Sequence, residues 1–287
     1  MDVIRIFNGL GNQMSQYAFY LAKKKVHPFR TCFVTNHYDC ENVHDGYELE
    51  RVFGIRSCRL KESVLYRFLS SHHVPFWGYR FFWHFTYEKR EASNYDFDER
   101  MLLPSRKFGF VFYWGGWHSE KYFGHLRDEL LQTFSFDENK LNADSVRWAE
   151  EIRNRTSTCA IHVRRGDFLK DSKWGGAMAP DYYQRAIAYV RGLHSDVCFY
   201  VFSNDIEWCR KQWGDENFRY VDCNRGTDSW QDMFLMSICR HHINANSSFS
   251  WWGAWLCRFD DTVVIVPKRF RADMITKDVY PDRWIKL

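Results

Sequence analysis

The chain has 287 residues, enough for two domains of about 100–200 residues each. Its 40 Lys and Arg against 36 Asp and Glu leave a formal net charge of +4, and so mild a basic balance does not imply nucleic acid as a partner. Aromatic residues make up 19% of the chain, which indicates large cores and favours a carbohydrate or nucleotide ligand that stacks on rings.

Nine cysteines are scattered along the chain, and no Cys-x-x-Cys pair occurs among them. An odd number without metal or redox spacing is typical of reduced thiols in a cytosol. The first residues, MDVIRIFNGLGNQ, contain no charged segment followed by an apolar one, and nowhere do about 18 uncharged apolar residues run together. We therefore expect a cytoplasmic protein that does not span a membrane.

The first half opens with a strand, a turn and a helix. Residues 2–7, DVIRIF, alternate apolar and polar side chains, and the following NGLGNQ is a glycine turn. Apolar residues then recur along one helix face that ends in a basic run: Met14, Tyr17, Ala18, Leu21 and Ala22, then Lys23, Lys24 and Lys25. The stretch from Ser57 to Met101 is basic and aromatic without a clear period, and we interpret it as irregular or helical decoration. Further helices are predicted near 126–134 and 142–155.

Apolar segments alternate with helical ones after Arg155. The predicted strands are TCAIHV, VCFYVFS, HHINA and TVVIVP, and the predicted helices lie near Pro180–Leu193, Glu207–Trp213 and Ser229–Arg240. Continuous apolar strands separated by helices indicate a parallel sheet covered on both faces. The sequence therefore predicts an α/β fold with two domains, 1–155 and 156–287.

Polar clusters follow three of these strands, at 162–167, 203–205 and 246–249. Ligands of parallel α/β sheets bind at the carboxyl ends of the strands. We therefore expect the three clusters to meet at one edge of the sheet.

The first cluster contains His162, Arg164, Arg165 and Asp167. Alternate side chains of a strand share a face, so the two arginines need not do the same work. One guanidinium can clamp two phosphate oxygens while Asp167 holds the other arginine. The alternative is a surface network of arginine and aspartate.

The other two clusters also have structural alternatives. Ser203, Asn204 and Asp205 form a turn signal by themselves. NSSFSWWGAWL, residues 246–256, combines a polar turn with an apolar helix, whose first N–H groups and hydroxyls would make an anion pocket. That segment also reads as a plain helix cap over buried tryptophans, and both interpretations can hold together.

No metal site is predicted. Asp96 and Asp98 resemble the Asp-x-Asp of some metal-dependent glycosyltransferases, but no apolar strand precedes them. The pairs His72–His73 and His241–His242 lack the spacing of metal ligands.

Five motifs in order make the chain resemble glycosyltransferase family 11, the α1,2-fucosyltransferases, of the compact bacterial type. They are GLGNQM (9–14), WHSEKYF (117–123), HVRRGD (162–167), VFSND (201–205) and NSSFSWWGAWL (246–256). The resemblance implies a GT-B architecture, in which two Rossmann-like domains face each other across a cleft. Residues 1–155 would be the acceptor side, and 156–287 would bind GDP-β-L-fucose.

The resemblance also implies roles for single residues. Arg164 and Arg165 would contact and support the diphosphate, Asn12 would approach the fucose, and Asp232 would read guanine. Ser247, Ser248 and Phe249 would hold the phosphates and ribose, with His162 near the nucleotide. The other residues expected at the substrates are Gly11, Trp117, His118, Glu120, Asp167, Ser203, Asp205 and Asn246. Asn8, Ser15 and His118 depart from the usual family pattern, which bears on the acceptor more than on the donor.

The implied reaction is an inverting, metal-independent transfer of fucose to the 2-hydroxyl of a terminal β-galactoside. No cofactor is expected, because GDP-fucose is a co-substrate. The base that takes the acceptor proton stays open between Asp167, Glu120, His118 and Asp205. The alternatives to this function are a fucosyltransferase of α1,6 or O-linked type and a non-catalytic nucleotide-sugar or carbohydrate-binding protein.

The expected partners are GDP-fucose and a galactose-terminated glycan. That glycan includes the case of a lipid-linked intermediate at the inner face of a bacterial membrane. The basic, aromatic residues 61–90 would then touch the membrane surface, and a merely solvated face is the alternative.

Overall fold

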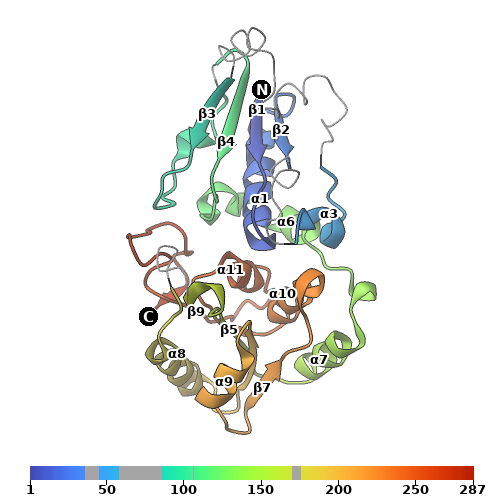
Figure 1. Cartoon of the computed structure of the whole chain (residues 1–287), viewed down its shortest axis with the longest axis vertical. Helices are drawn as coiled ribbons and strands as arrows, with labels where there is room; N and C mark the ends of the chain where they lie inside the picture. The colour runs from blue at the N-terminus through green and yellow to red at the C-terminus, as the bar shows by residue number, and fades with distance from the viewer. Residues whose placement is uncertain (36–44, 58–85, 106, 170–175) are drawn as a thin grey trace. The chain divides into compact units, whose positions relative to one another are not determined.

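A computed structural model of the whole chain describes residues 1–35, 45–57, 86–105, 107–169 and 176–287. The chain divides into two compact units, Met1–Ser135 and Phe136–Leu287, and Figure 1 labels most of their helices and strands. Each unit has its own sheet, and all described strand pairs are parallel. The predicted α/β class is confirmed. Cys40, Cys58, the pair His72–His73 and most of the expected membrane-contact stretch lie outside the described residues.

The first unit has a four-stranded sheet of order β2-β1-β4-β3. Its strands are β1 (Asp2–Arg5), β2 (Thr31–Val34), β3 (Thr86–Arg90) and β4 (Phe110–Trp114). Its helices are α1 (Leu10–Val26), α3 (Glu48–Phe53) and α6 (Arg127–Thr133), with short 3-10 turns η2 (Glu99–Met101), η3 (Glu120–Tyr122) and η4 (Gly124–Leu126). The predicted opening of strand, turn and helix is confirmed.

β3 corrects the interpretation of Ser57–Met101 as irregular or helical. Its sequence, TYEKR, has no buried residue, and it forms the edge of the sheet. An edge strand that buries neither face carries no period-2 apolar signal, so pairing with β4 decides its conformation.

Lys23 in the last turn of α1 is fully buried, although the sequence suggested only a charge favourable to the helix end. Its Nζ lies 3.1 Å from Asp2 Oδ2 and donates to the carbonyl oxygens of Met101 and Leu103 at 2.9 and 2.8 Å. A buried ammonium needs such a set of acceptors. The pair fastens α1 to β1 and to the turn after η2.

The second unit has a six-stranded sheet of order β10-β9-β8-β5-β6-β7. The strands are β5 (Thr158–Val163), β6 (Cys198–Ser203), β7 (Phe218–Val221), β8 (His241–Ile243), β9 (Val264–Val266) and β10 (Ile285–Lys286). The helices are α7 (Ala143–Arg153), α8 (Pro180–Leu193), α9 (Ile206–Gln212), α10 (Trp230–Ser237) and α11 (Ser248–Trp255), with 3-10 turns η5 (Glu138–Lys140), η6 (Asp167–Leu169) and η7 (Gly226–Asp228). Every strand and helix predicted after Arg155 is present.

Both faces of this sheet are buried, as predicted. Neighbouring residues of β5 and β6 point to opposite faces, so each strand feeds two cores. On one face Ile161 and Val201 pack with Tyr183 of α8. On the other face Ala160 and Tyr200 pack with residues of α7 and α10.

The units divide between Ser135 and Phe136, earlier than the predicted boundary after residue 155. The reason is α7, whose Ala149 and Ile152 share a core with Tyr200 and Phe234. The sequence shows that this segment is helical but not which sheet it covers. No helix among the described residues is long and apolar enough to cross a lipid bilayer.

Candidate active site

The three polar clusters follow three adjacent strands, β8, β5 and β6, whose register is parallel. They therefore lie at the same carboxyl edge of the larger sheet. The sequence predicted this meeting from the strand pattern alone, and the strand order confirms it.

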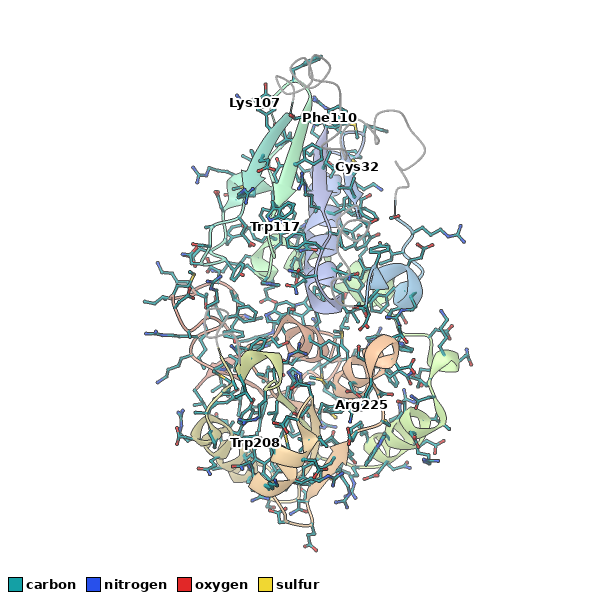
Figure 2. The ribbon with its side chains drawn as sticks, in the orientation of Figure 1. Cys32, Lys107, Phe110, Trp117, Trp208 and Arg225 are labelled. Carbon is teal, nitrogen blue, oxygen red and sulfur yellow. The ribbon has the colours of Figure 1, made fainter. Side chains whose placement is uncertain are left out.

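Arg165 is held by the loop that follows β6. Its backbone N–H donates to Asn204 Oδ1 at 2.9 Å, and its Nε donates to Asp205 Oδ2 at 3.1 Å. Its guanidinium carbon lies 4.0 Å from the ring centre of Trp208, which Figure 2 labels. Asp205 thus does what the sequence analysis assigned to Asp167, whose side chain is outside the described part of the structure.

Asp205 has a second task, since its Oδ1 accepts from the backbone N–H of Trp208 at 3.3 Å and caps α9. Ser203 Oγ accepts from the N–H of Asp205 at 2.9 Å. The Ser-Asn-Asp segment is therefore a turn and a support for an arginine at once.

Gly166 lets the two loops approach closely. A Cβ atom at this position would lie 2.6 Å from Asn204 Nδ2, nearer than non-bonded atoms can come. The loops that follow β5 and β6 can therefore touch because residue 166 is a glycine.

His162 and Arg164 share one face of the strand end. His162 is buried, and its ring centre lies 5.9 Å from that of Phe249. Burial, with Arg164 as a second cause, lowers the pKa of His162 to about 3, so the imidazole is neutral at pH 7. Its Nδ1 has no hydrogen-bond partner among the described residues. The guanidinium carbon of Arg164 lies 5.7 Å from the ring centre of Phe168.

α11 begins at the third cluster. Ser247 Oγ accepts from the N–H of Phe249 at 3.3 Å and caps the helix, with Ser248 in its first turn. Asn246 is buried; its Nδ2 donates to Phe270 O at 3.4 Å, and its Oδ1 has no partner among the described residues. The interpretation as a helix cap over buried tryptophans is confirmed, because three residues of α11 are core residues: Trp251, Trp252 and Trp255. The anion pocket stays a prediction.

Asp232 lies in the first turn of α10, which packs against α11. Its Oδ1 accepts from Asn224 Nδ2 at 2.8 Å. Asn224 is held in turn by Asn142 Nδ2 at 2.8 Å and by Ser145 Oγ at 3.2 Å, both from the start of α7. Burial raises the pKa of Asp232 to about 7.

In the first unit, Gly11 and Asn12 lie in the first turn of α1, after Asn8, whose φ is 65°. His118 is buried; its Nδ1 lies 3.2 Å from Ser15 Oγ, and burial lowers its pKa to about 4. Glu120 begins the turn η3.

Trp117, expected at the substrates, is a core residue of the first unit. Its ring stacks on Phe19 with centres 4.0 Å apart, and it is fully buried. Figure 2 labels its position.

Glu91, directly after β3, was not among the residues predicted from the sequence. Its Oε2 accepts from the N–H groups of Gly116 and Trp117 at 2.7 and 2.8 Å. Burial raises the pKa of Glu91 to about 7, against these two hydrogen bonds. No pattern in the sequence indicated that β3 is a strand. Had β3 been predicted, the rule that ligands bind at the carboxyl ends of parallel strands would have pointed to Glu91.

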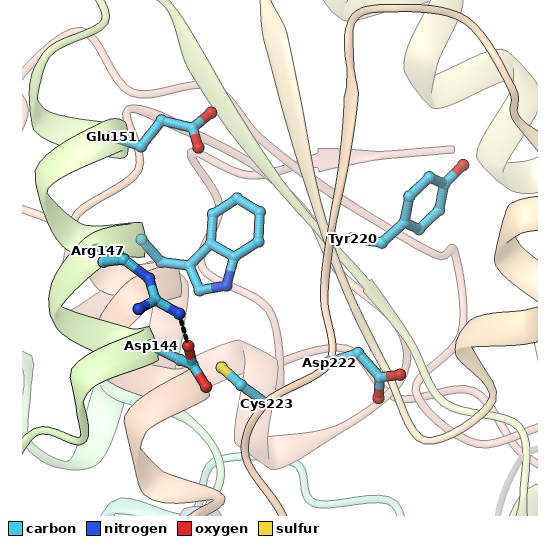
Figure 3. A pocket seen from close by; sticks show the side chains of 7 residues that line it. Asp144, Arg147, Glu151, Tyr220, Asp222 and Cys223 are labelled. Carbon is cyan, nitrogen blue, oxygen red and sulfur yellow. Dashed lines mark hydrogen bonds and ion pairs between the residues drawn. The ribbon is translucent and has the colours of Figure 1, made fainter.

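A hollow of about 450 Å³ lies between α7 and the end of β7 (Figure 3). No predicted site residue lines it, and its charges are paired: Asp144 with Arg147, Glu151 with Arg219, and Asp222 with Arg225. The residues around it are Asp144, Arg147, Trp148, Glu151, Tyr220, Asp222 and Cys223.

The metal-site alternatives have other contacts. Asp98 pairs with Arg100 at 2.8 Å and caps η2, and Asp96 accepts from Asn94 Nδ2 at 2.7 Å. His241 and His242 are buried in β8. Within the described ranges, no three His, Cys, Asp or Glu side chains are grouped so that they could hold a metal ion.

Comparison with known proteins gives a family match. The model of the family described as glycosyl transferase family 11 matches residues 78–287. The O-antigen biosynthesis glycosyltransferase WbnK of Escherichia coli is 31% identical over 97% of this chain and 98% of its own. The alpha-1,2-colitosyltransferase of Escherichia coli is 29% identical over 99% and 98%. The galactoside alpha-(1,2)-fucosyltransferase 1 of Leontopithecus chrysomelas is 30% identical over 48% of this chain and 41% of its own.

Solved structures share the fold. The fucosyltransferase NodZ from Bradyrhizobium matches with a TM-score of 0.55 and 13% identity over 88% of this chain and 90% of its own. A mutant of Arabidopsis thaliana FUT1 in complex with GDP matches with a TM-score of 0.50 and 10% identity, over 94% and 71%. At such identities the likeness concerns the fold alone, and the predicted GT-B class is confirmed.

Proposed function

This chain belongs to glycosyl transferase family 11, and we propose that it transfers L-fucose from GDP-β-L-fucose to the 2-hydroxyl of a terminal β-galactoside. The observation that carries the proposal is the carboxyl edge of the larger sheet, where Arg164, a fixed Arg165 and the start of α11 follow neighbouring strands. The family, and relatives named for α-1,2 transfer, support the linkage.

The chemistry asks for fixed positive charge. As the bond to the sugar breaks, negative charge grows on the departing diphosphate, and preorganised donors stabilise it best. Arg165 is already held by Asp205 and Trp208, so we assign it support and assign Arg164 the diphosphate contact. The first N–H groups of α11, with Ser247 and Ser248, supply further donors.

We assign the remaining residues to the nucleotide, the fucose and the acceptor as the family resemblance implies. Asp232 would accept hydrogen bonds from the guanine N–H groups, and His162 and Phe249 would flank the nucleotide. Residues of the first unit, Asn12 among them, would meet the fucose and the acceptor. The inverted product needs a single displacement without an enzyme nucleophile, so a base must take the acceptor proton.

The acceptor proposed is an O-antigen glycan ending in a β-galactoside, because WbnK is named for O-antigen biosynthesis. Such an intermediate would be assembled on a lipid at the inner face of a bacterial membrane. We propose a cytoplasmic enzyme there; residues 58–85, where most of the expected membrane contact falls, are outside the described part.

A second donor is favoured by one observation, the full-length similarity to an alpha-1,2-colitosyltransferase. Colitose is L-fucose without the 3-hydroxyl, so both sugars present the same reacting carbon. A site that forms a hydrogen bond to the 3-hydroxyl of fucose would reject colitose strongly. A site that only leaves room for this hydroxyl would discriminate weakly between the two donors.

The test incubates the purified chain with GDP-fucose or GDP-colitose and a panel of type 1, type 2 and simple β-galactosides, in EDTA. A 1,2-linked fucosyl product identified by NMR supports the proposal. A preference for GDP-colitose assigns the second donor, another linkage assigns a different fucosyltransferase, and binding without turnover refutes catalysis. Loss of activity in EDTA with recovery in manganese would contradict the metal-free site.

A further inference from the structure

Glu91 lies at the carboxyl edge of the smaller sheet. Its backbone N–H donates to Trp114 O at 2.9 Å, so it extends the pairing of β3 with β4 by one residue. The carboxyl ends of parallel strands are where such sheets place ligands. Glu91 thus occupies in the first unit the kind of position that Arg164 occupies in the second.

Two consecutive glycines, Gly115 and Gly116, lie beside this edge and leave no room for a side chain. A Cβ atom on Gly115 would lie 2.5 Å from the Cβ and 2.8 Å from the Oε2 of Glu91. A Cβ atom on Gly116 would lie 2.5 Å from Nε2 of His118. The backbone after β4 therefore passes between the two side chains and admits no side chain of its own.

Two non-glycine residues with left-handed backbone conformations, Tyr95 and Trp117, contact the same turn. Among the described residues, the non-glycine residues with positive φ are Asn8, Tyr95 and Trp117, at 65°, 57° and 53°. Trp117 donates its N–H to Glu91, and the Tyr95 ring lies 5.2 Å from that of His118. Strained backbone of this kind persists where the surroundings hold it and occurs often at functional sites.

Of the two carboxyl oxygens of Glu91, one accepts hydrogen bonds from the described residues. Oε2 accepts the two N–H groups of the turn, which fixes the plane of the carboxylate. Oε1 is buried and has no hydrogen-bond partner among the described residues. A buried acceptor left unpaired costs free energy, so its presence calls for an explanation. A hydroxyl group of a bound molecule would supply the donor that this atom lacks.

Two of the bases left open by the sequence, Asp205 and His118, are worse suited. Both oxygens of Asp205 are engaged, with Arg165 and with the α9 cap. His118, with a pKa lowered to about 4, is a weak base. A general base works best with a pKa near the operating pH, and Glu91, at about 7, meets that condition. No charged side chain is among the causes of its shift.

We propose that Glu91 is the general base of the transfer and that its Oε1 takes the proton of the acceptor hydroxyl. The inference rests on the proposed function. The acceptor oxygen forms the new bond to C1 of the donor sugar while the bond from C1 to the phosphate oxygen breaks, and that electron pair leaves with the nucleoside diphosphate. The acceptor proton passes to Glu91, which returns it to water after product release.

The test is Glu91→Gln, assayed with the acceptor that the wild-type chain uses. A glutamine oxygen still accepts the two N–H groups of Gly116 and Trp117, so the turn is preserved, but the amide cannot take a proton. We expect kcat to fall by about 10²–10⁴-fold, with the acceptor KM within about threefold and an unchanged melting temperature. Glu88→Gln, the same change on an exposed residue of β3, is the matched control and should keep wild-type kcat.

The pH profile of the wild-type enzyme gives an independent measurement that needs no variant. A base must be deprotonated, so kcat/KM should rise with pH through about 7 and then level, because burial raises the pKa of Glu91 to about 7. Glu91→Gln should lack this rise. A flat wild-type profile between pH 5.5 and 8 would overturn the proposal.

Other results would also overturn it. A raised acceptor KM with unchanged kcat in Glu91→Gln would mean that Glu91 only holds the turn. Loss of turnover in Glu120→Gln with normal turnover in Glu91→Gln would move the base to Glu120. The wild-type transfer assay, run first, decides the proposed function separately, since each of these results leaves fucosyl transfer itself standing.

Discussion

At the scale of single residues, the two adjacent arginines differ in their surroundings. Arg165 has a carboxylate partner, a backbone hydrogen bond to Asn204 and the ring of Trp208 beside its guanidinium, and the guanidinium carbon of Arg164 lies 5.7 Å from the ring centre of Phe168. Because neighbouring side chains of a strand point to opposite faces, the sequence predicted that Arg164 and Arg165 have different roles. Only the structure assigns the supported position to Arg165.

Arg164→Ala should lower kcat by about 10²–10³-fold, the loss typical for one preorganised transition-state donor. Arg165→Ala should lower the melting temperature as well as kcat, because Asp205 and Trp208 lose their partner. Steady-state kinetics and thermal denaturation on both variants check this. An unchanged melting temperature in Arg165→Ala would contradict its assignment as the supported arginine.

Asp232→Asn should make stability depend less on pH. Burial raises the pKa of Asp232 to about 7, above its value in the unfolded chain. The ionised carboxyl therefore destabilises the fold above pH 7, and this cost disappears as the pH falls from about 7 towards 4. The variant should melt higher than wild type at pH 8, with a smaller difference at pH 5.

Calorimetric titration with GDP tests the second role of Asp232 on the same protein. If the carboxylate reads guanine, Asp232→Asn should weaken GDP binding at pH 8 despite its higher stability. Unchanged affinity would remove Asp232 from the nucleotide site.

At the scale of elements, function depends on where strands end. β5 and β6 are adjacent, so the loops after them touch through Gly166, Asn204 and Arg165. The apolar pattern of both strands was sufficient to predict this meeting. β3 lacks such a pattern, and the element that carries Glu91 was therefore missed.

Gly166→Ala should displace Asn204 and loosen the support of Arg165. The overpacking should cost about 1–3 kcal/mol in stability and raise the KM for the donor. Because the clash is with the Asn204 side chain, Gly166→Ala combined with Asn204→Ala should regain part of the stability. A double-mutant cycle by denaturant unfolding measures this coupling, and strict additivity would refute it.

At the scale of the whole molecule, the chain consists of two units that each bury a core of their own. α7 belongs to the second core through Ala149 and Ile152. Its first residues also bond to Asn224, the partner of Asp232. The boundary of the second unit therefore affects both its stability and its proposed guanine contact.

A fragment of residues 136–287 should fold cooperatively and bind GDP without transferring sugar. A fragment of residues 156–287 lacks α7 and exposes the face of Tyr200 and Phe234. Loss of a buried residue such as Ile152 alone costs about 2–5 kcal/mol, a large part of a typical domain stability. Circular dichroism melting of both fragments checks this. A cooperative transition in the shorter one would restore the boundary at residue 155.

The sequence by itself determined the α/β class, the strands β5, β6, β8 and β9 of the second unit, and the three polar clusters at the carboxyl ends of β5, β6 and β8. It did not predict β7 and β10. The predicted features follow from local information: the period of apolar residues sets each element, and chain direction in a parallel sheet sets the edge at which loops meet. Three of the five family motifs include these loops, which is why most of the candidate donor residues could be named from the sequence.

Only the tertiary structure decided which carboxylate holds Arg165 and to which unit α7 belongs. It also decided that Oε1 of Glu91 is buried without a hydrogen-bond partner among the described residues. Each depends on contacts between residues far apart in the chain, such as Arg165 with Asp205 and Glu91 with Trp117. Burial and partner geometry set the pKa of a carboxyl, and neither is a property of its neighbours in sequence.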